Sequence, residues 1–151
     1  MPCAPNQTHL SCDPGFFALL NDSHKRFVGP PLAPPGRNAA WLYNEAPFVV
    51  LAHNTESDPI FTYANRAAQL CFEYSWEEFT SLPSRLSAEA PDRADRQTLL
   101  DEVTRNGFTT GYRGMRIAKS GRRFLIERAT VWQLVDADGI VRGQAATFAL
   151  P

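Results

Sequence analysis

The sequence lacks the features that would place the protein in a membrane, on nucleic acid or outside the cell. Its longest apolar stretch covers residues 46–52, whereas a membrane-spanning helix needs about 20 apolar residues. Fifteen Lys and Arg against sixteen Asp and Glu give a net charge of −1, and no basic run favours direct contact with nucleic acid. The N-terminus has neither the basic nor the apolar region of a secretory signal. We expect a cytoplasmic protein without membrane contact.

Cysteine and histidine are also scarce. The three cysteines are an odd number that does not indicate a disulfide framework, so we expect reduced thiols. Cys3, His9 and Cys12 lie close together, but a structural zinc normally takes four ligands and the paired Cys-x-x-Cys spacing is absent. The sequence therefore predicts no metal site.

The length of 151 residues is that of one domain, which buries roughly 70% of the surface of its unfolded chain. Residues 1–12 contain Pro2 and Pro5 and are predicted to form a flexible tail. Residues 13–45 are predicted to form N-terminal helices joined by a Pro-rich linker. Residues 46–151 are predicted to form the core.

The C-terminal third is predicted to be a three-stranded antiparallel meander. The expected strands cover residues 111–117, 123–135 and 140–148. Ser120-Gly121 and Asp138-Gly139 separate them, and glycine adopts the positive φ of a hairpin turn without steric cost.

The long central strand is apolar on both faces, so both faces should be covered. Strict alternation predicts two sets of neighbours: Phe124, Ile126, Arg128, Thr130, Trp132 and Leu134 on one face, and Leu125, Ala129, Val131 and Val135 on the other.

An amphipathic helix is predicted after Asp13, which is suited to the N-cap, with Pro14 at the first helical position. Apolar residues from Phe16 to Phe27 recur at helical spacing, and a helix this short needs a surface to pack on. We expect it to dock on the outer face of the sheet, over the set that includes Val131, and to shape a homodimer there.

The middle of the chain predicts two strands, residues 47–53 and 59–63, followed by helices. Asn38 and Asn65 are expected N-caps, and Ser75-Trp-Glu-Glu78 has the spacing of a capping box. Leu82 to Pro91 is expected to be irregular. A longer helix is predicted over residues 93–106, with Leu99, Leu100 and Val103 on one stripe and Gly107 as its stop.

This order of elements resembles the PAS sensor fold. Pro59 to Ala68 looks like a PAS strand running into its Tyr-x-Asn signature. More specifically, the chain is similar to the MEKHLA family of PAS-like domains. The similar segments are Ala46 to His53, Leu82 to Glu89, Gly121 to Phe124, Val131-Trp132 and Gly143 to Phe148. The resemblance implies an α+β, PAS-like fold: a five-stranded antiparallel sheet with helices on one face and the N-terminal helix covering the other.

PAS domains bind flavin, haem, a small metabolite or nothing, and the sequence allows a test of the first two. The hairpin of photosensing flavin domains aligns on residues 116–126, but Arg116 and Ile126 stand where its two asparagines would be. Its glutamine falls at Ala145 and its reactive cysteine at Ser84. All histidines precede the long late helix that usually carries a haem ligand. We therefore expect no flavin or haem.

The same alignment suggests a binding site for a small organic anion. If Arg116 and Ile126 face a ligand, alternation adds Arg128, and two guanidiniums could hold a carboxylate or phosphate bidentately. The alternative is that these arginines extend to solvent. Further residues are candidate wall groups of the same pocket: Phe124, Thr130, Trp132, His53, Tyr63, Phe72, Phe79 and Ala145. His53 has a pKa suited to switching, although a histidine at the end of a strand needs no function.

We expect a stand-alone sensory or ligand-binding module rather than an enzyme, passing its signal to another copy or to a separate effector protein. One alternative is a small cone-shaped α+β enzyme with His53 as an acid–base group. Another is a ligand-free module for protein interaction or dimerisation.

Overall fold

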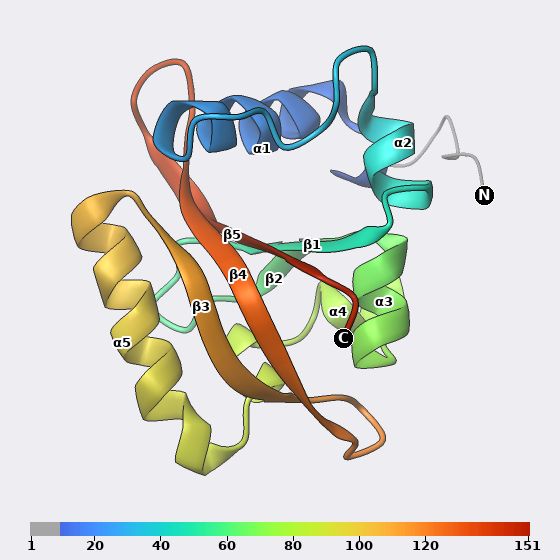
Figure 1. Ribbon diagram of the computed structural model, residues 1–151, viewed down its shortest axis with the longest axis vertical. Helices are drawn as coiled ribbons and strands as arrows, with labels where there is room; N and C mark the ends of the chain where they lie inside the picture. The colour runs from blue at the N-terminus through green and yellow to red at the C-terminus, as the bar shows by residue number, and fades with distance from the viewer. Residues whose placement is uncertain (1–9) are drawn as a thin grey trace.

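One antiparallel sheet of five strands organises the molecule, and the computed structural model describes residues 10–151 (Figure 1). Its strand order is β2-β1-β5-β4-β3, so the first strand lies beside the last. The β3–β4–β5 meander is confirmed and forms the larger half of the sheet. The strands are β1 (Phe48–His53), β2 (Phe61–Ala64), β3 (Phe108–Ile117), β4 (Arg123–Val135) and β5 (Val141–Ala149).

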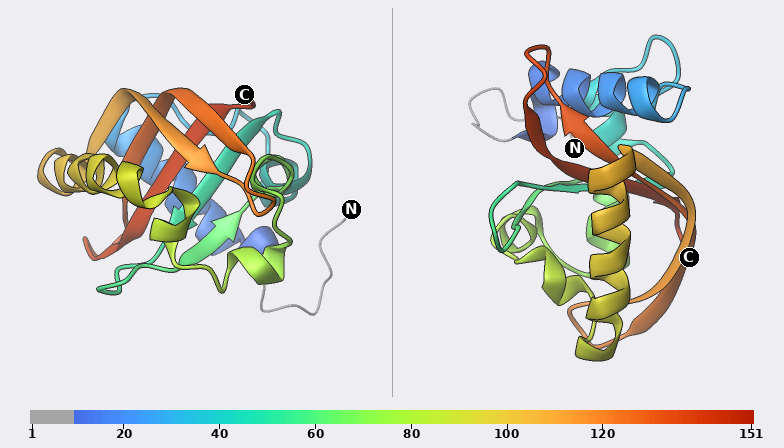
Figure 2. Two further views of the ribbon diagram at one scale, coloured as in Figure 1. Left: turned by 90° about the horizontal axis from the view of Figure 1, so that it is seen from below. Right: turned by 90° about the vertical axis from the view of Figure 1, so that its left-hand side faces the viewer.

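Helices cover both faces of this sheet. Figure 2 shows α1 across one face and α5 across the other, with β3 and β4 curving around α5. The first group covers the outer face and consists of η1 (Leu10–Cys12), α1 (Pro14–Phe27) and α2 (Ala39–Asn44). The second group covers the inner face and consists of α3 (Arg66–Phe72), α4 (Trp76–Phe79), η2 (Ser84–Ser87) and α5 (Ala90–Asn106). No helix in the described part of the chain is long and apolar enough to cross a membrane.

The predicted helix starts are confirmed by their capping bonds. Asp13 accepts a hydrogen bond from the backbone N–H of Phe16 at 3.1 Å, and Asn38 accepts one from Trp41 at 3.0 Å. Ser75 forms the reciprocal capping box with Glu78. These side chains satisfy N–H groups that a helix cannot pair internally.

Asn65 caps α3 and also joins it to two other segments. Its Oδ1 accepts from the N–H of Ala68 and from the N–H of Val50, both at 3.0 Å. Its Nδ2 donates to the carbonyls of Leu42 at 3.2 Å and Phe48 at 2.9 Å. All four bonds that a primary amide forms are therefore used on backbone groups.

The long helix α5 begins at Ala90, three residues before the predicted start. Pro91 lies in its first turn, where a missing N–H costs nothing, so the proline opens the helix instead of interrupting it. Gly107 ends the helix in the left-handed region at φ 89°, as predicted.

A β-bulge overturns the predicted faces of β4. A three-residue step on β4, from Ile126 to Ala129, lies opposite a two-residue step on β3, from Gly114 to Tyr112. Arg128 takes the extra place with a left-handed φ of 54°. An extra residue changes the phase of alternation, so Ala129 lies on the same face as Ile126.

Because of the bulge, the β4 residues that α1 covers differ from those predicted. Trp132 and Leu134 lie in the outer core with Leu20 of α1, whereas Val131 packs against α5 on the inner face. The His24 ring meets the Trp132 ring edge-on, with centroids 4.8 Å apart. The prediction that the N-terminal helix covers the outer face is thus confirmed, but the prediction that it covers Val131 is wrong.

The cysteines differ from the expectation of reduced thiols. Cys71 is a free, buried thiol, and burial raises its pKa to about 11. Cys12 is disulfide-bonded. Most of the predicted flexible tail, including Cys3 and His9, lies outside the described residues. Within residues 10–151, no group of three His, Cys, Asp or Glu side chains is placed to hold a metal ion.

Candidate functional site

A buried cavity of about 50 Å³ lies between the inner face of the sheet and α5. Its wall is mainly apolar, because residues of all five strands meet the apolar stripe of the helix. The apolar residues that line it include Leu51, Phe72, Leu99, Ile126, Val131 and Phe148. Its polar wall groups are few, and each can be traced to its position in the fold.

Arg116 reaches the cavity from β3 and is only 8% exposed. Its guanidinium donates to the carbonyl of Met115 at 2.8 Å and to the Tyr112 hydroxyl at 3.2 Å. Gly114 makes this arrangement possible, since a Cβ at that position would lie 2.3 Å from the Tyr112 hydroxyl oxygen. The spacing Tyr112-x-Gly114-x-Arg116 therefore places the hydroxyl and the guanidinium together on one face.

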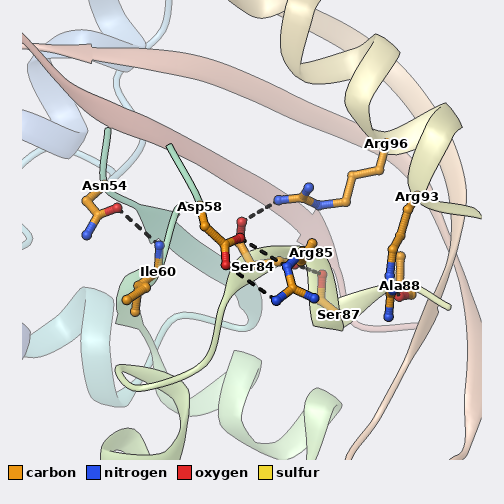
Figure 3. Close-up of polar contacts among 9 residues, drawn as sticks. All are labelled: Asn54, Asp58, Ile60, Ser84, Arg85, Ser87, Ala88, Arg93 and Arg96. Atoms are coloured by element: carbon orange, nitrogen blue, oxygen red, sulfur yellow. Dashed lines mark hydrogen bonds and ion pairs between the residues drawn. The ribbon is translucent and has the colours of Figure 1, made fainter. Parts of the chain in front are cut away.

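Arg96 reaches the same cavity from α5 and is only 7% exposed. Its guanidinium donates to the Ser84 hydroxyl, and the Ser87 hydroxyl donates to the Ser84 carbonyl at 2.8 Å (Figure 3). Burial, together with the positive charge of Arg116, lowers the pKa of Arg96 to about 10. The guanidinium remains protonated at neutral pH, in an environment that disfavours its charge.

Among the described residues, neither buried guanidinium forms an ion pair with a carboxylate, although the more distant charge of Asp58 acts to raise the pKa of Arg96. The ion pairs within residues 10–151 involve other basic side chains, such as Arg85 with Asp58 and Arg122 with Glu73. Arg116 and Arg96 instead bind neutral oxygens of backbone and hydroxyl groups.

His53 and Gln144 form a further polar part of the wall. They are register partners on β1 and β5, so their side chains lie side by side on the inner face. His53 Nδ1 lies 2.9 Å from the carbonyl oxygen of Asn54. Burial, followed by the charge of Arg96, lowers the pKa of His53 to about 4, although the Asn54 carbonyl acts in the opposite direction. The imidazole is therefore neutral at neutral pH.

A surface groove of about 610 Å³ adjoins the cavity. It lies between the β1–β2 loop, residues 54–60, and α5. Four residues line both spaces: His53, Arg96, Leu100 and Gln144. In the loop, Asp58 accepts from Arg85 Nε at 3.1 Å (Figure 3). A molecule that entered the cavity from this groove would pass Arg96 of α5 on one side and Gln144 of β5 on the other.

Comparison with known proteins identifies the chain by its sequence. The profile of the MEKHLA domain matches residues 15–150, which is nearly all of the chain. The chain belongs to the MEKHLA domain family. A comparison with curated proteins gives no match.

Solved structures similar to this MEKHLA domain show that its fold is the PAS fold. A PAS domain from Colwellia psychrerythraea has a TM-score of 0.62 at 15% identity, over 73% of this chain and 92% of that one. A PAS domain from a two-component sensor histidine kinase has a TM-score of 0.56 at 23% identity, over 72% and 87%. The light-state dimer of the fungal blue-light photoreceptor Vivid has a TM-score of 0.55 at 17% identity, over 78% and 82%.

The structure of the MEKHLA domain brings together part of the predicted pocket. Five predicted wall residues line the cavity: His53, Phe72, Arg116, Ile126 and Ala145. Phe79 and Phe124 lie in the inner core and pack on Phe72 at centroid distances of 5.5 and 5.0 Å.

Four other predicted wall residues lie elsewhere. Arg128 is exposed on the bulge, so the prediction that it faces the pocket with Arg116 is wrong. Thr130 and Trp132 follow the bulge and lie on the outer face, where Trp132 packs in the α1 core. Tyr63 belongs to the same outer core and stacks with Phe16.

The sequence analysis missed Arg96 and Gln144. A signal for Arg96 exists, because it lies three, four and seven residues before Leu99, Leu100 and Val103 and so belongs to the buried stripe of α5. A charged residue on an apolar stripe is unusual enough to mark a site. Gln144 had a weaker signal, since its face follows only from the register of β5 with β1.

Proposed function

We propose that this MEKHLA domain is a sensory module that binds a small organic anion in the cavity beneath α5, between Arg96 and Arg116. The observation that carries the proposal is the pair of buried guanidiniums without a carboxylate partner. Arg96 thus takes the place of Arg128 in the arginine pair that was expected from the sequence.

The electrostatics of the cavity support this function. Removing an ion from water has an effective penalty of several kcal/mol in a real protein, and a nearby like charge adds to it. The hydrogen bonds of Arg96 and Arg116 to neutral oxygens offset only part of this penalty. A carboxylate between them would neutralise charge and accept charge-assisted hydrogen bonds, which are roughly twice as strong as neutral ones.

The size of the cavity limits the class of anion. A water-sized group needs about 10–15 Å³ of cavity volume, so the cavity of about 50 Å³ holds roughly four non-hydrogen atoms. Drug-sized ligands and cofactors occupy pockets of about 300–1,000 Å³. The space suits a short carboxylate, whose remaining atoms could extend into the adjoining groove.

The geometry gives less support to an enzyme built on His53. The hydrogen bond of that ring is to a backbone carbonyl rather than to a carboxylate, and its pKa is about 4. A general acid or base works best with a pKa near the working pH.

The predicted homodimer and effector protein remain predictions. The Vivid structure, a dimer of a similar fold, makes the dimer worth testing by light scattering.

Thermal unfolding in the presence of short carboxylates tests the proposal. A ligand at about one hundred times its Kd stabilises the folded state by about 2.7 kcal/mol. We expect acetate, propionate or glycolate to raise the Tm of the wild type, and Arg96→Met and Arg116→Met to abolish the rise. Arg128→Met is the matched control, because it removes the exposed arginine of the same sheet and should leave the rise unchanged.

Two results would contradict the proposed function. One is a carboxylate panel in which no member stabilises the wild type more than Arg96→Met. The other is an equal loss of anion response in Arg128→Met, since it would indicate a general effect of net charge.

Without added anion, Arg96→Met should be at least as stable as the wild type, because methionine avoids burying a charge.

A further inference from the structure

His53 offers the cavity wall a hydrogen-bond acceptor. Its Nδ1 bonds the Asn54 carbonyl, and a carbonyl oxygen only accepts, so Nδ1 carries the proton. The other nitrogen, Nε2, is then an unprotonated acceptor. It is buried and has no hydrogen-bond partner within residues 10–151.

Gln144 offers a second acceptor next to it. Its Nε2 lies 3.3 Å from the Leu100 carbonyl, 3.1 Å from Thr104 Oγ1 and 3.4 Å from Gln133 Oε1. The Thr104 hydroxyl donates its own proton to Leu100, so all three atoms act as acceptors toward the amide nitrogen. These contacts fix the orientation of the amide. The Gln144 Oε1 is buried without a partner, and the residue is only 8% exposed.

The wall thus combines positive donors with unpaired neutral acceptors. Arg96 and Arg116 require an anion, whereas His53 Nε2 and Gln144 Oε1 require a donor, since a buried polar atom without a bond costs about 1–3 kcal/mol. A simple carboxylate meets the first requirement only. A ligand with both a carboxylate and a hydroxyl group meets both requirements.

The charges of the cavity select between the two common donors of small acids. An ammonium group would add a cation beside two buried guanidiniums, which is unfavourable in a weakly screened interior. A hydroxyl group donates without charge. We propose that the ligand is a short hydroxycarboxylate, with its carboxylate at Arg96 and Arg116 and its hydroxyl donating to His53 Nε2 or Gln144 Oε1. This inference rests on the proposed function and narrows its ligand class.

Pairs of acids that differ by one hydroxyl group test the inference. We would measure binding to the full-length protein by isothermal titration calorimetry for glycolate against acetate, lactate against propionate, and glycine as the ammonium analogue. The wild type should prefer each hydroxy acid by about tenfold or more, the size of one or two hydrogen bonds. Glycine should bind more weakly than glycolate.

Variants of the cavity wall would show which residue is responsible for the preference for hydroxy acids. His53→Phe and Gln144→Met remove the acceptors at similar size, and we expect one of them to reduce the glycolate-to-acetate ratio toward one while acetate affinity changes little. Gln97→Met in the groove is the control and should keep the ratio. If these variants unfold, ¹⁵N NMR of the wild type gives a second readout. A change in the His53 Nε2 or Gln144 side-chain signals with glycolate, and a smaller one with acetate, supports the inference.

The outcomes separate the inference from the proposed function. Equal binding of glycolate and acetate, both lost in Arg96→Met, would overturn the hydroxycarboxylate and leave the anion site standing. Tighter binding of glycine would also overturn it, in favour of an amino acid. If no acid of the panel binds, both the inference and the proposed function fail.

Discussion

Lowering the pH should destabilise the protein through His53 before most carboxylates titrate. The pKa of this ring is 6.5 in the unfolded chain and about 4 in the folded protein, because burial and the charge of Arg96 disfavour imidazolium. The folded state therefore binds fewer protons than the unfolded state between these values. The stability held by neutral His53 is fully present above pH 6.5 and declines as the pH falls toward 4.

The size of this loss follows from the two pKa values. Between about pH 7.5 and about pH 5, a single site with this shift removes about 2 kcal/mol from the free energy of unfolding. Urea unfolding at both pH values would measure the loss in the wild type and in His53→Gln. The glutamine does not titrate and can still donate to the Asn54 carbonyl. We expect the variant to lose about 2 kcal/mol less than the wild type over this range.

His24→Gln is the matched control. Burial also lowers the pKa of His24, although less strongly than for His53, and its ring contacts Trp132 on the opposite face of the sheet. His24→Gln should remove the contribution of His24 to the pH dependence of the free energy of unfolding and leave the contribution of His53 unchanged. Parallel stability profiles for the wild type and His53→Gln would refute the reasoning, as would an NMR titration of His53 with a midpoint near 6.5.

Two further pairs of substitutions test the close approach of two strands and the packing of the outer core. Gly143→Ala should cost about 3 kcal/mol or more, because its Cβ would lie 2.0 Å from the His53 carbonyl oxygen. Gly139→Ala, also at positive φ but in open space, should cost only about 1 kcal/mol, and equal costs in chemical denaturation would contradict the steric argument. Leu20→Ala should cost about 3 kcal/mol because Leu20 is fully buried between α1 and the sheet, whereas the exposed Leu70→Ala should cost less than about 0.5 kcal/mol. A comparable shift of Tm in both leucine variants would show that α1 does not hold the outer core.

Local signals in the sequence predicted most of the fold. The caps at Asp13, Asn38 and Asn65 and the Gly107 stop depend on a few neighbouring residues, and the structure confirms them. The hairpin turns are local in the same sense. Such signals are readable because both the donor and the acceptor of each bond lie within one turn of chain.

The site was harder to predict because it depends on distant segments. Alternation failed at Arg128, where one extra residue turned the rest of β4 over, and bulges have no reliable signal in a single sequence. Arg116 pairs with Phe124, which precedes the bulge on β4, and its position was predicted correctly. The helical spacing places Arg96 on the buried stripe of α5, but its position beside Gln144 at the cavity depends on the strand register and on the packing of α5 on the sheet.

The four bonds of Asn65 have a consequence for how the protein opens. One side chain ties the end of α2, two positions of β1 and the first turn of α3, so none of these segments can open alone without breaking buried hydrogen bonds. The amide protons of Val50 and Ala68 should therefore exchange with solvent together, at one shared rate, although 18 residues separate them in the chain. Aspartate at this position would keep the two acceptor bonds and lose both donor bonds. We therefore expect the end of α2, β1 and the start of α3 to open as one cooperative unit.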